Sequence, residues 1–64
     1  MKTKLEEFHE ETGISQSFIA KKAGLTASAY SLIVRGKSMP SLPSALKIAR
    51  AVGKTVEYLW GDDI

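Results

Sequence analysis

The segment from Gln16 to Arg35 constrains the fold most, because its small and apolar residues suit two short helices that cross at a tight turn. Ala20 and Gly24 are small where the two helices would touch. Other apolar residues recur at spacings that turn them toward a common core: Ile19, Ala23, Leu25, Tyr30 and Ile33. The segment therefore predicts a helix-turn-helix. The outer side chains of its second helix are left free to face a partner, and a helix presented in this way fits the major groove of DNA.

The charges are distributed unevenly along the chain. No Asp or Glu occurs from Thr12 to Val56, and all the acidic residues lie toward the two ends. The acid-free stretch carries these basic residues: Lys21, Lys22, Arg35, Lys37, Lys47, Arg50 and Lys54. Taken singly, any one of these lysines is explained as a solvated surface charge. Together they make the local field more positive than the net charge of +2 implies, an asymmetry that attracts a polyanion.

Length and composition exclude several classes of function. Sixty-four residues form one domain, 1–64, with a modest core. Without Cys and with a single His, the chain has neither a disulfide nor the roughly four ligands of a structural zinc site. It also lacks a Gly-rich phosphate loop and a second His for a proton relay, so we expect no enzyme, no cofactor and no small-molecule substrate. No apolar run approaches the roughly twenty residues that cross a bilayer, so we expect no membrane partner and a cytoplasmic protein.

Capping residues and glycines divide the chain into five predicted helices. The first covers Thr3–Thr12, and Ser15 caps the second, Gln16–Ala23. Thr26 caps a third helix that runs to about Arg35, and Thr55 caps a short fifth helix that ends before Gly61. Ser41 caps the fourth helix, whose predicted apolar stripe is Leu42, Ala45, Leu46, Ala49 and Val52. No stretch alternates like a half-buried strand, so the predicted class is all-α.

Four short motifs occur together in this chain. Ser-Gln opens the second helix, Ala-Lys-Lys-Ala-Gly forms the turn, Arg-Gly-Lys follows the third helix and Pro-Ser-Leu opens the fourth. With them, residues 5–60 resemble the Cro and C1 repressor type of helix-turn-helix, the Xre-like family. The resemblance implies a five-helix, lambda-repressor-like domain. Such a domain docks its third helix in the major groove of double-stranded DNA, usually as a homodimer.

The resemblance also implies roles for individual residues. Gln16 falls where the family contacts the phosphate backbone, and Arg35, Lys37 and Ser38 fall in the loop that follows a phosphate strand. The hydroxyls of Ser41 and Ser44 add donors at the start of the fourth helix. The positions that usually face base edges, with one residue beside them, hold Ala27, Ser28, Leu32 and Ser31. These side chains cannot make bidentate contacts to bases, so we expect modest specificity, biased toward thymine methyl groups.

Three positions depart from the family. Many members pair an Arg at the position of His9 with a Glu at the position of Val34, and here both are replaced. We therefore interpret His9 as a packed or surface histidine rather than a ligand. Phe18 stands where the family is commonly polar. It either folds under the first helix or marks a protein contact.

A dimer contact is expected toward the C-terminal side, from Met39, Val56, Tyr58 and Trp60. Trp60 is either the anchor of this contact or a residue that closes the core of the monomer. The leading hypothesis is a sequence-specific DNA-binding repressor of phage, mobile-element or small-operon type. The rival hypothesis is a protein-interaction module, of antitoxin or anti-repressor type, that uses Phe18, Leu32 and Val34.

Overall fold

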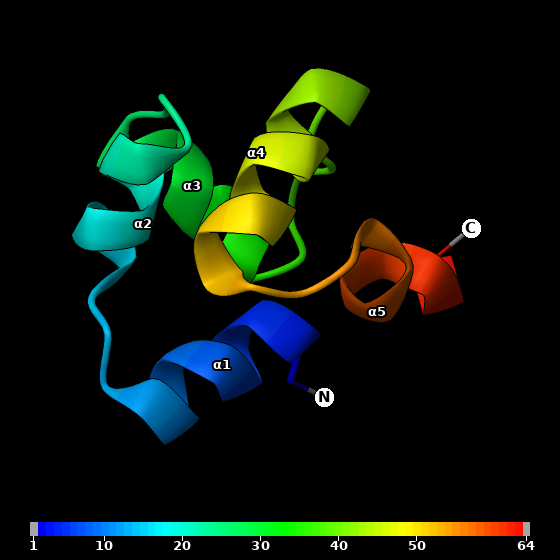
Figure 1. Cartoon of the computed structure of the whole chain (residues 1–64), viewed down its shortest axis with the longest axis horizontal. Coiled ribbons are helices and arrows are strands. Elements are labelled where there is room, and N and C mark those ends of the chain that lie inside the picture. The colour runs from blue at the N-terminus through cyan, green and yellow to red at the C-terminus, as the bar shows by residue number, and fades with distance from the viewer. Residues whose placement is uncertain (1, 64) are drawn as a thin grey trace.

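The computed structural model describes residues 2–63, and its five α-helices confirm the predicted all-α class (Figure 1). The elements are α1 (Lys4–Thr12), α2 (Gln16–Lys22), α3 (Ala27–Val34), α4 (Leu42–Val52) and α5 (Val56–Trp60), followed by a 3₁₀ turn (Gly61–Asp63). The helix bounds agree with the predicted ones to within one residue. The last α-helix ends at Trp60, before Gly61, as predicted, and the chain continues from Gly61 as a 3₁₀ turn. None of the helices in the described range is both long and apolar enough to cross a membrane.

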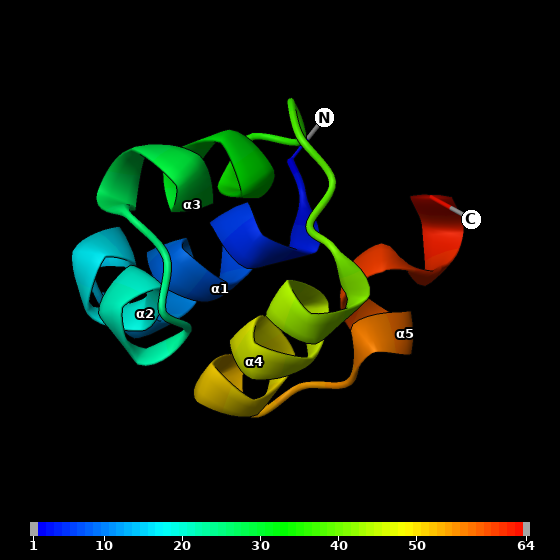
Figure 2. The same cartoon turned by 90° about the horizontal axis from the view of Figure 1, so that it is seen from above.

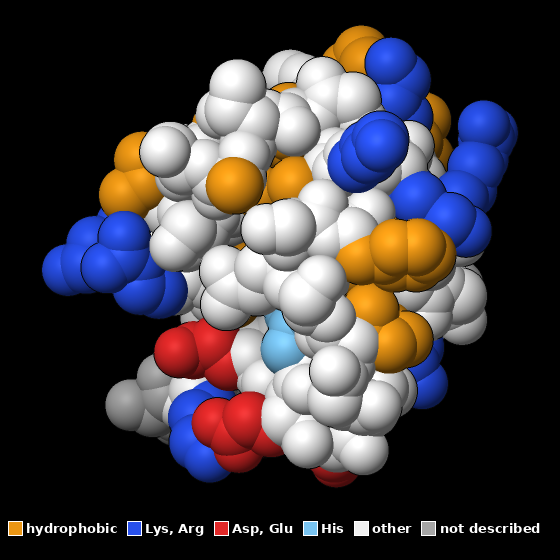
Figure 3. Space-filling view, turned by 90° about the vertical axis from the view of Figure 1, so that its left-hand side faces the viewer, with side chains coloured by type: hydrophobic (Ala, Val, Ile, Leu, Met, Phe, Trp, Pro, Cys, Tyr) orange, Lys and Arg blue, Asp and Glu red, His pale blue; other side chains and the backbone are white. Residues whose placement is uncertain are grey.

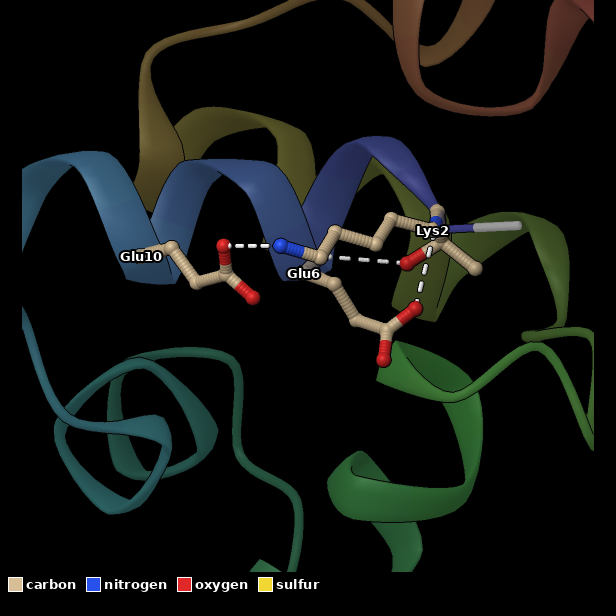
Figure 4. Close-up of polar contacts among 4 residues, drawn as sticks. Lys2, Glu6 and Glu10 are labelled. Atoms are coloured by element: carbon tan, nitrogen blue, oxygen red, sulfur yellow. Dashed lines mark hydrogen bonds and ion pairs between the residues drawn. The ribbon is translucent and has the colours of Figure 1, made fainter.

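Each α-helix begins at a Ser or Thr whose hydroxyl accepts the amide hydrogen three residues later. These caps are Thr3, Ser15, Thr26, Ser41 and Thr55. At α1 the capping box is complete, because the Glu6 carboxylate also accepts the Thr3 amide at 2.9 Å (Figure 4). Lys2 forms an exposed ion pair with Glu10 along the same helix. A cap stabilises a helix by about 0.5–2 kcal/mol, which matters here because helices this short are marginal alone.

The core lies between the helices. Figures 1 and 2 show α2 and α3 side by side at one end of the molecule and α5 at the other, with α4 and α1 between them. The buried side chains come from all five helices and include Leu5, Ile19, Tyr30, Ile48 and Trp60. A single core therefore holds the two helices of the helix-turn-helix in a fixed relation.

The apolar stripe predicted for α4 was partly wrong. Ala45, Ala49 and Val52 are buried as predicted, but Ile48 takes the central place in the core, while Leu42 and Leu46 are exposed. Leu46 follows Ala45 by one residue, about 100° around the helix, which turns it away from the core. The structure thus leaves two large aliphatic side chains of α4 in solvent.

Candidate nucleic-acid interface

An open groove runs between the start of α2 and the outer face of α3. Its lining residues are Gln16, Ser17, Ala27, Ser28, Ser31, Leu32 and Arg35. All four residues predicted to face base edges are therefore brought together, with two of the predicted phosphate contacts at their sides. Because only small hydroxyls and aliphatic groups line its centre, the groove offers single hydrogen bonds and methyl contacts.

The turn between α2 and α3 fixes how this face is presented. Ala20 and Ala23 are buried where the two helices meet. Gly24 has φ +73°, a left-handed conformation that glycine adopts without strain. The Leu25 amide then donates to the Ala20 carbonyl at 2.9 Å, and Thr26 caps α3. Small residues, a left-handed glycine and a cap therefore set the crossing of the two helices.

The inner face of α3 is anchored from the middle of the helix to its C-terminal end. Tyr30, Ile33 and Val34 are buried. The Thr3 hydroxyl, which caps α1, also donates to the Val34 carbonyl at 2.5 Å. With its inner residues packed in this way, α3 has little freedom to rotate, so its outer residues keep their relative positions.

His9 connects three parts of the molecule. Its Nδ1 donates to the Ile14 carbonyl at 2.7 Å, so in the neutral ring Nε2 accepts from the Tyr30 hydroxyl at 2.8 Å. The imidazole also packs edge-on against Phe8 and Tyr30, with ring centroids 5.2 and 5.6 Å apart. Burial raises the pKa of Tyr30 well above its usual value. His9 is thus half-buried and packed against aromatic rings, and the sequence predicted a packed or surface histidine.

Two of the predicted phosphate contacts, Gln16 and Arg35, line the groove, whereas Lys37, Ser38, Ser41 and Ser44 lie outside its lining. Arg35, Lys37 and Ser38 are exposed where α3 ends, and Gln16 is half-buried at the start of α2. Ser41 is also exposed, but its hydroxyl caps α4 and lies 3.2 Å from the hydroxyl of the half-buried Ser44. Because the Ser41 hydroxyl already donates to Ser44, the Ser44 hydroxyl is the one of the two that is free to donate to a phosphate.

The charges are segregated over the surface. Figure 3 shows Lys and Arg side chains on both flanks of an uncharged area, with the acidic side chains along the lower edge, over α1. Among the side chains that the structure describes, the only ion pair joins Lys2 to Glu10, so none of the basic residues from Lys21 to Lys54 forms an ion pair there. A polyanion would meet a positive field on either side of the groove.

Several expected contacts are placed differently by the structure. Phe18 is 52% exposed and lies beside Lys22, whose Nζ is 5.2 Å from the ring centroid, so the idea that it folds under α1 was wrong. Val34 is fully buried and cannot belong to an apolar protein-binding surface. Trp60 is only 6% exposed and closes the core of the monomer, with Val56 partly buried against the core. Of the expected dimer residues, Met39 and Tyr58 remain on the surface.

Comparison with known proteins identifies the same arrangement elsewhere. A helix-turn-helix family model, HTH_3, matches residues 5–59. An uncharacterised HTH-type transcriptional regulator of Archaeoglobus fulgidus is 37% identical over 60 residues, which cover 94% of this chain and 86% of that protein.

Solved structures agree in fold. The P22 c2 repressor, in complex with a synthetic operator, aligns with a TM-score of 0.79 at 22% identity, over 86% of this chain and 83% of that chain. SinR, a master regulator for biofilm formation solved in complex with DNA, aligns with a TM-score of 0.73 at 30% identity, over 86% and 89% of the two chains.

Proposed function

Because the chain belongs to the HTH_3 family of helix-turn-helix transcriptional regulators, we propose that it represses transcription by laying α3 in the major groove of operator DNA. The resemblance to the Cro/C1 type is confirmed by the family match and by the repressor fold of its structural neighbours. In this proposal the protein acts as a homodimer and serves a phage, a mobile element or a small operon. A protein that represses by blocking a promoter needs only to bind the DNA there.

The groove between α2 and α3 carries this proposal. It gathers Ala27, Ser28, Ser31 and Leu32 on one exposed face, between Gln16 and Arg35, in a part of the chain without acidic residues. An α-helix fits the major groove, and the exposed basic residues where α3 ends suit a phosphate strand. SinR, which is 30% identical, was solved in complex with DNA, and this supports duplex DNA as the partner here.

Phosphate contacts would position the protein, and the face of α3 would supply the specificity. Arg35, Lys37 and Gln16 would contact phosphates, with Ser38, Ser41 and Ser44 as neutral donors. If a dimer neutralises about six phosphates, the logarithm of the binding constant falls with log salt at a slope of roughly −5. Readout at the bases would rest on single hydroxyl contacts and on Leu32 against thymine methyl groups, without the strong bidentate pairs.

Fluorescence anisotropy with a random-sequence duplex tests the electrostatic part. Replacing both Arg35 and Lys37 with Gln is expected to weaken binding and to reduce the steepness of the salt dependence by about two per monomer. Lys54→Gln is the matched control, because Lys54 lies against Tyr58 and away from the residues that line the groove. A salt-independent affinity, or an equal loss in the control, contradicts the proposal.

Selection of binding sites from random duplexes tests the readout. We expect a motif of modest information content in which thymine-containing steps are enriched opposite α3. A motif dominated by guanines that contact α3 would contradict this assignment, because none of the four side chains can pair with guanine bidentately.

A second candidate function is favoured by Phe18 and Ile14, which are exposed outside the groove. Exposed apolar side chains on α2 and in the loop before it suit a protein partner, as in an antitoxin or anti-repressor. Titration of nonspecific duplex at low salt separates the two functions. Micromolar or tighter binding supports the DNA-binding role, and no binding supports the protein-interaction module.

A further inference from the structure

The residue that caps α1 also contacts the end of α3. The Thr3 hydroxyl accepts the Glu6 amide at 3.0 Å, as a helix cap does, and it donates to the Val34 carbonyl at 2.5 Å. Figure 2 shows the start of α1 beside the end of α3, although the two segments are far apart in the sequence. One half-buried threonine therefore joins the first turn of α1 to the last turn of α3.

The hydrogen bond from Thr3 serves a carbonyl that the helix itself leaves without a partner. At the end of α3 the carbonyls of residues 31–33 each accept a backbone amide from residues 35–37. Of the hydrogen bonds among the described residues, only the one from Thr3 reaches the next carbonyl, that of Val34. Val34 is fully buried, and a buried carbonyl without a partner is unfavourable. The end of α3 is therefore completed by a residue of another helix.

Thr3 contacts the residues on both sides of Arg35. Its hydroxyl bonds to Val34, and its Cγ2 methyl lies 3.3 Å from the position that a Cβ on Gly36 would take. Gly36 has φ +76° and turns the chain between Arg35 and Lys37. The backbone hydrogen bonds within the turn fix its shape, whereas Thr3 holds the turn against α1.

We propose that Thr3 is a positioning residue for DNA binding, which holds Arg35 and Lys37 where they meet a phosphate strand. The proposal rests on the repressor function argued above, in which these two side chains contact phosphates. Both are exposed, and Arg35 makes only a long contact of 3.5 Å from its Nε to the Ser31 carbonyl. The backbone therefore decides where the two charges lie. Charge-assisted hydrogen bonds form at about 2.7–2.9 Å, so a small displacement of the turn breaks them.

This role is specific to Thr3 and is not shared by the other helix caps. Among the described residues, the hydroxyls of the other four caps bond only within their own helices. Thr55 is the best match, because its hydroxyl accepts the Tyr58 amide at 3.0 Å and α5 lies at the opposite end of the molecule from α3 (Figure 1). A comparison of the two threonines therefore separates the loss of a cap from the loss of the contact with α3.

Fluorescence anisotropy with a random-sequence duplex compares Thr3→Val with Thr55→Val. Both variants keep the shape of the side chain and lose a cap, and sucrose keeps both folded during the measurement. Thr3→Val is expected to weaken binding by roughly three- to tenfold and to reduce the steepness of the salt dependence by up to about two per monomer. Thr55→Val is expected to bind like wild type. Thr3→Ser keeps the hydroxyl and is expected to restore binding, and a Ser variant as weak as Thr3→Val overturns the proposal.

A double-mutant cycle shows whether Thr3 acts through the two basic residues. Replacing Arg35 and Lys37 with Gln should weaken binding less in the Thr3→Val background than in wild type, because the two charges are already displaced there. Lys54→Gln should have the same effect in both backgrounds, since Lys54 lies against Tyr58. Additive effects of Thr3→Val and the double Gln replacement would overturn the proposal.

Hydrogen exchange, measured without DNA, gives a readout that does not depend on the proposed function. Thr3→Asp supplies an acceptor for the cap but no donor for the Val34 carbonyl, so it serves if Thr3→Val does not fold. In either variant the Gly36 and Lys37 amides are expected to exchange faster relative to the Tyr30 amide, which is bonded near the start of the same helix. In Thr55→Val this ratio is expected to match that of wild type.

The two measurements separate the proposal from the function on which it rests. Faster exchange at the turn in a protein that binds no duplex disproves the regulator and keeps the positioning role of Thr3. Wild-type exchange at the turn in the Thr3 variants, or duplex binding weakened equally by Thr3→Val and Thr55→Val, disproves the positioning role and keeps the regulator.

Discussion

At the scale of single residues, the contact between His9 and Tyr30 is the main polar connection between α1 and the interior of α3. The resemblance to the Cro and C1 type implies that many family members have an Arg at the position of His9 and a Glu at the position of Val34. Here a neutral ring and a buried hydroxyl make the connection, and Val34 is packed in the core. A hydrogen bond between neutral groups avoids the cost of removing two charges from water.

Removing either partner of this hydrogen bond should have unequal effects. His9→Ala leaves the buried Tyr30 hydroxyl without its acceptor and is expected to lower the free energy of unfolding by about 1–3 kcal/mol. Tyr30→Phe keeps the ring, and the half-buried imidazole can turn toward water, so the expected loss is about 0.5–1.5 kcal/mol. Urea denaturation measures both. Equal losses, or no loss in His9→Ala, would contradict this account of the contact.

The burial of Tyr30 predicts a loss of stability in alkali. Burial raises the pKa of Tyr30 in the folded state, whereas in the unfolded chain the phenol ionises near pH 10. The unfolded state therefore loses its proton first, and the free energy of unfolding falls as pH rises above about 10, by up to about 1.4 kcal/mol per pH unit. Below about pH 9 this contribution is fully present.

The difference between wild type and Tyr30→Phe isolates this effect, since all other ionisable groups are the same in both proteins. Urea denaturation at several pH values from 8 to 11 should show the two free energies converging in alkali. Parallel curves would show that Tyr30 ionises as easily in the folded protein as in the unfolded chain.

At the scale of elements, the turn between α2 and α3 depends on one glycine. A Cβ at Gly24 would meet no atom within 4 Å, so crowding does not limit this position. The φ angle of +73° is what favours glycine at this position, because residues with a Cβ adopt this conformation at a cost of about 1–2 kcal/mol.

Gly24→Ala is therefore expected to lower the free energy of unfolding by about 1–2 kcal/mol without changing the helical content of the folded state. Gly24→Asn is the matched control with a smaller loss, because Asn tolerates the left-handed region. Thermal denaturation followed by circular dichroism makes the comparison. An alanine variant as stable as wild type would show that the turn relaxes into another conformation.

The sequence predicted elements well where local chemistry decides them. Ser15, Thr26, Ser41 and Thr55 were identified as caps because their hydroxyls serve the first turn of the helix that follows them. Thr3 was assigned to α1 itself, although it is the cap. The rotation of α4 was harder to predict, because several of its apolar residues could form the stripe and only packing against α2 and α5 selects Ile48 over Leu46.

The site was predictable for a similar reason. Residues of α3 that are not needed for the core must lie on its outer face, and the structure places the predicted base-facing residues together in the groove. The sequence alone could not show the contact of His9 with Tyr30, which joins residues 21 positions apart. It also could not decide whether Trp60 lies inside the monomer, since a buried and an interfacial tryptophan have the same local pattern.

At the scale of the whole molecule, the proposed homodimer predicts that stability depends on protein concentration. A dimer forms only from folded chains, so mass action stabilises the folded state as protein concentration rises. We expect the midpoint of thermal unfolding to rise with wild-type concentration across the micromolar range. Scanning calorimetry at several concentrations checks this, and a wild-type midpoint that does not move would indicate a monomer.

The acidic side chains of α1 are separated from the basic flanks of the groove, and this gives the molecule a permanent electric dipole moment. In the electric field of a duplex such a molecule experiences a torque as well as an attraction. The torque orients the molecule before the two surfaces touch. Encounters would then begin with α1 pointing away from the double helix, so that fewer collisions are wasted on the wrong side.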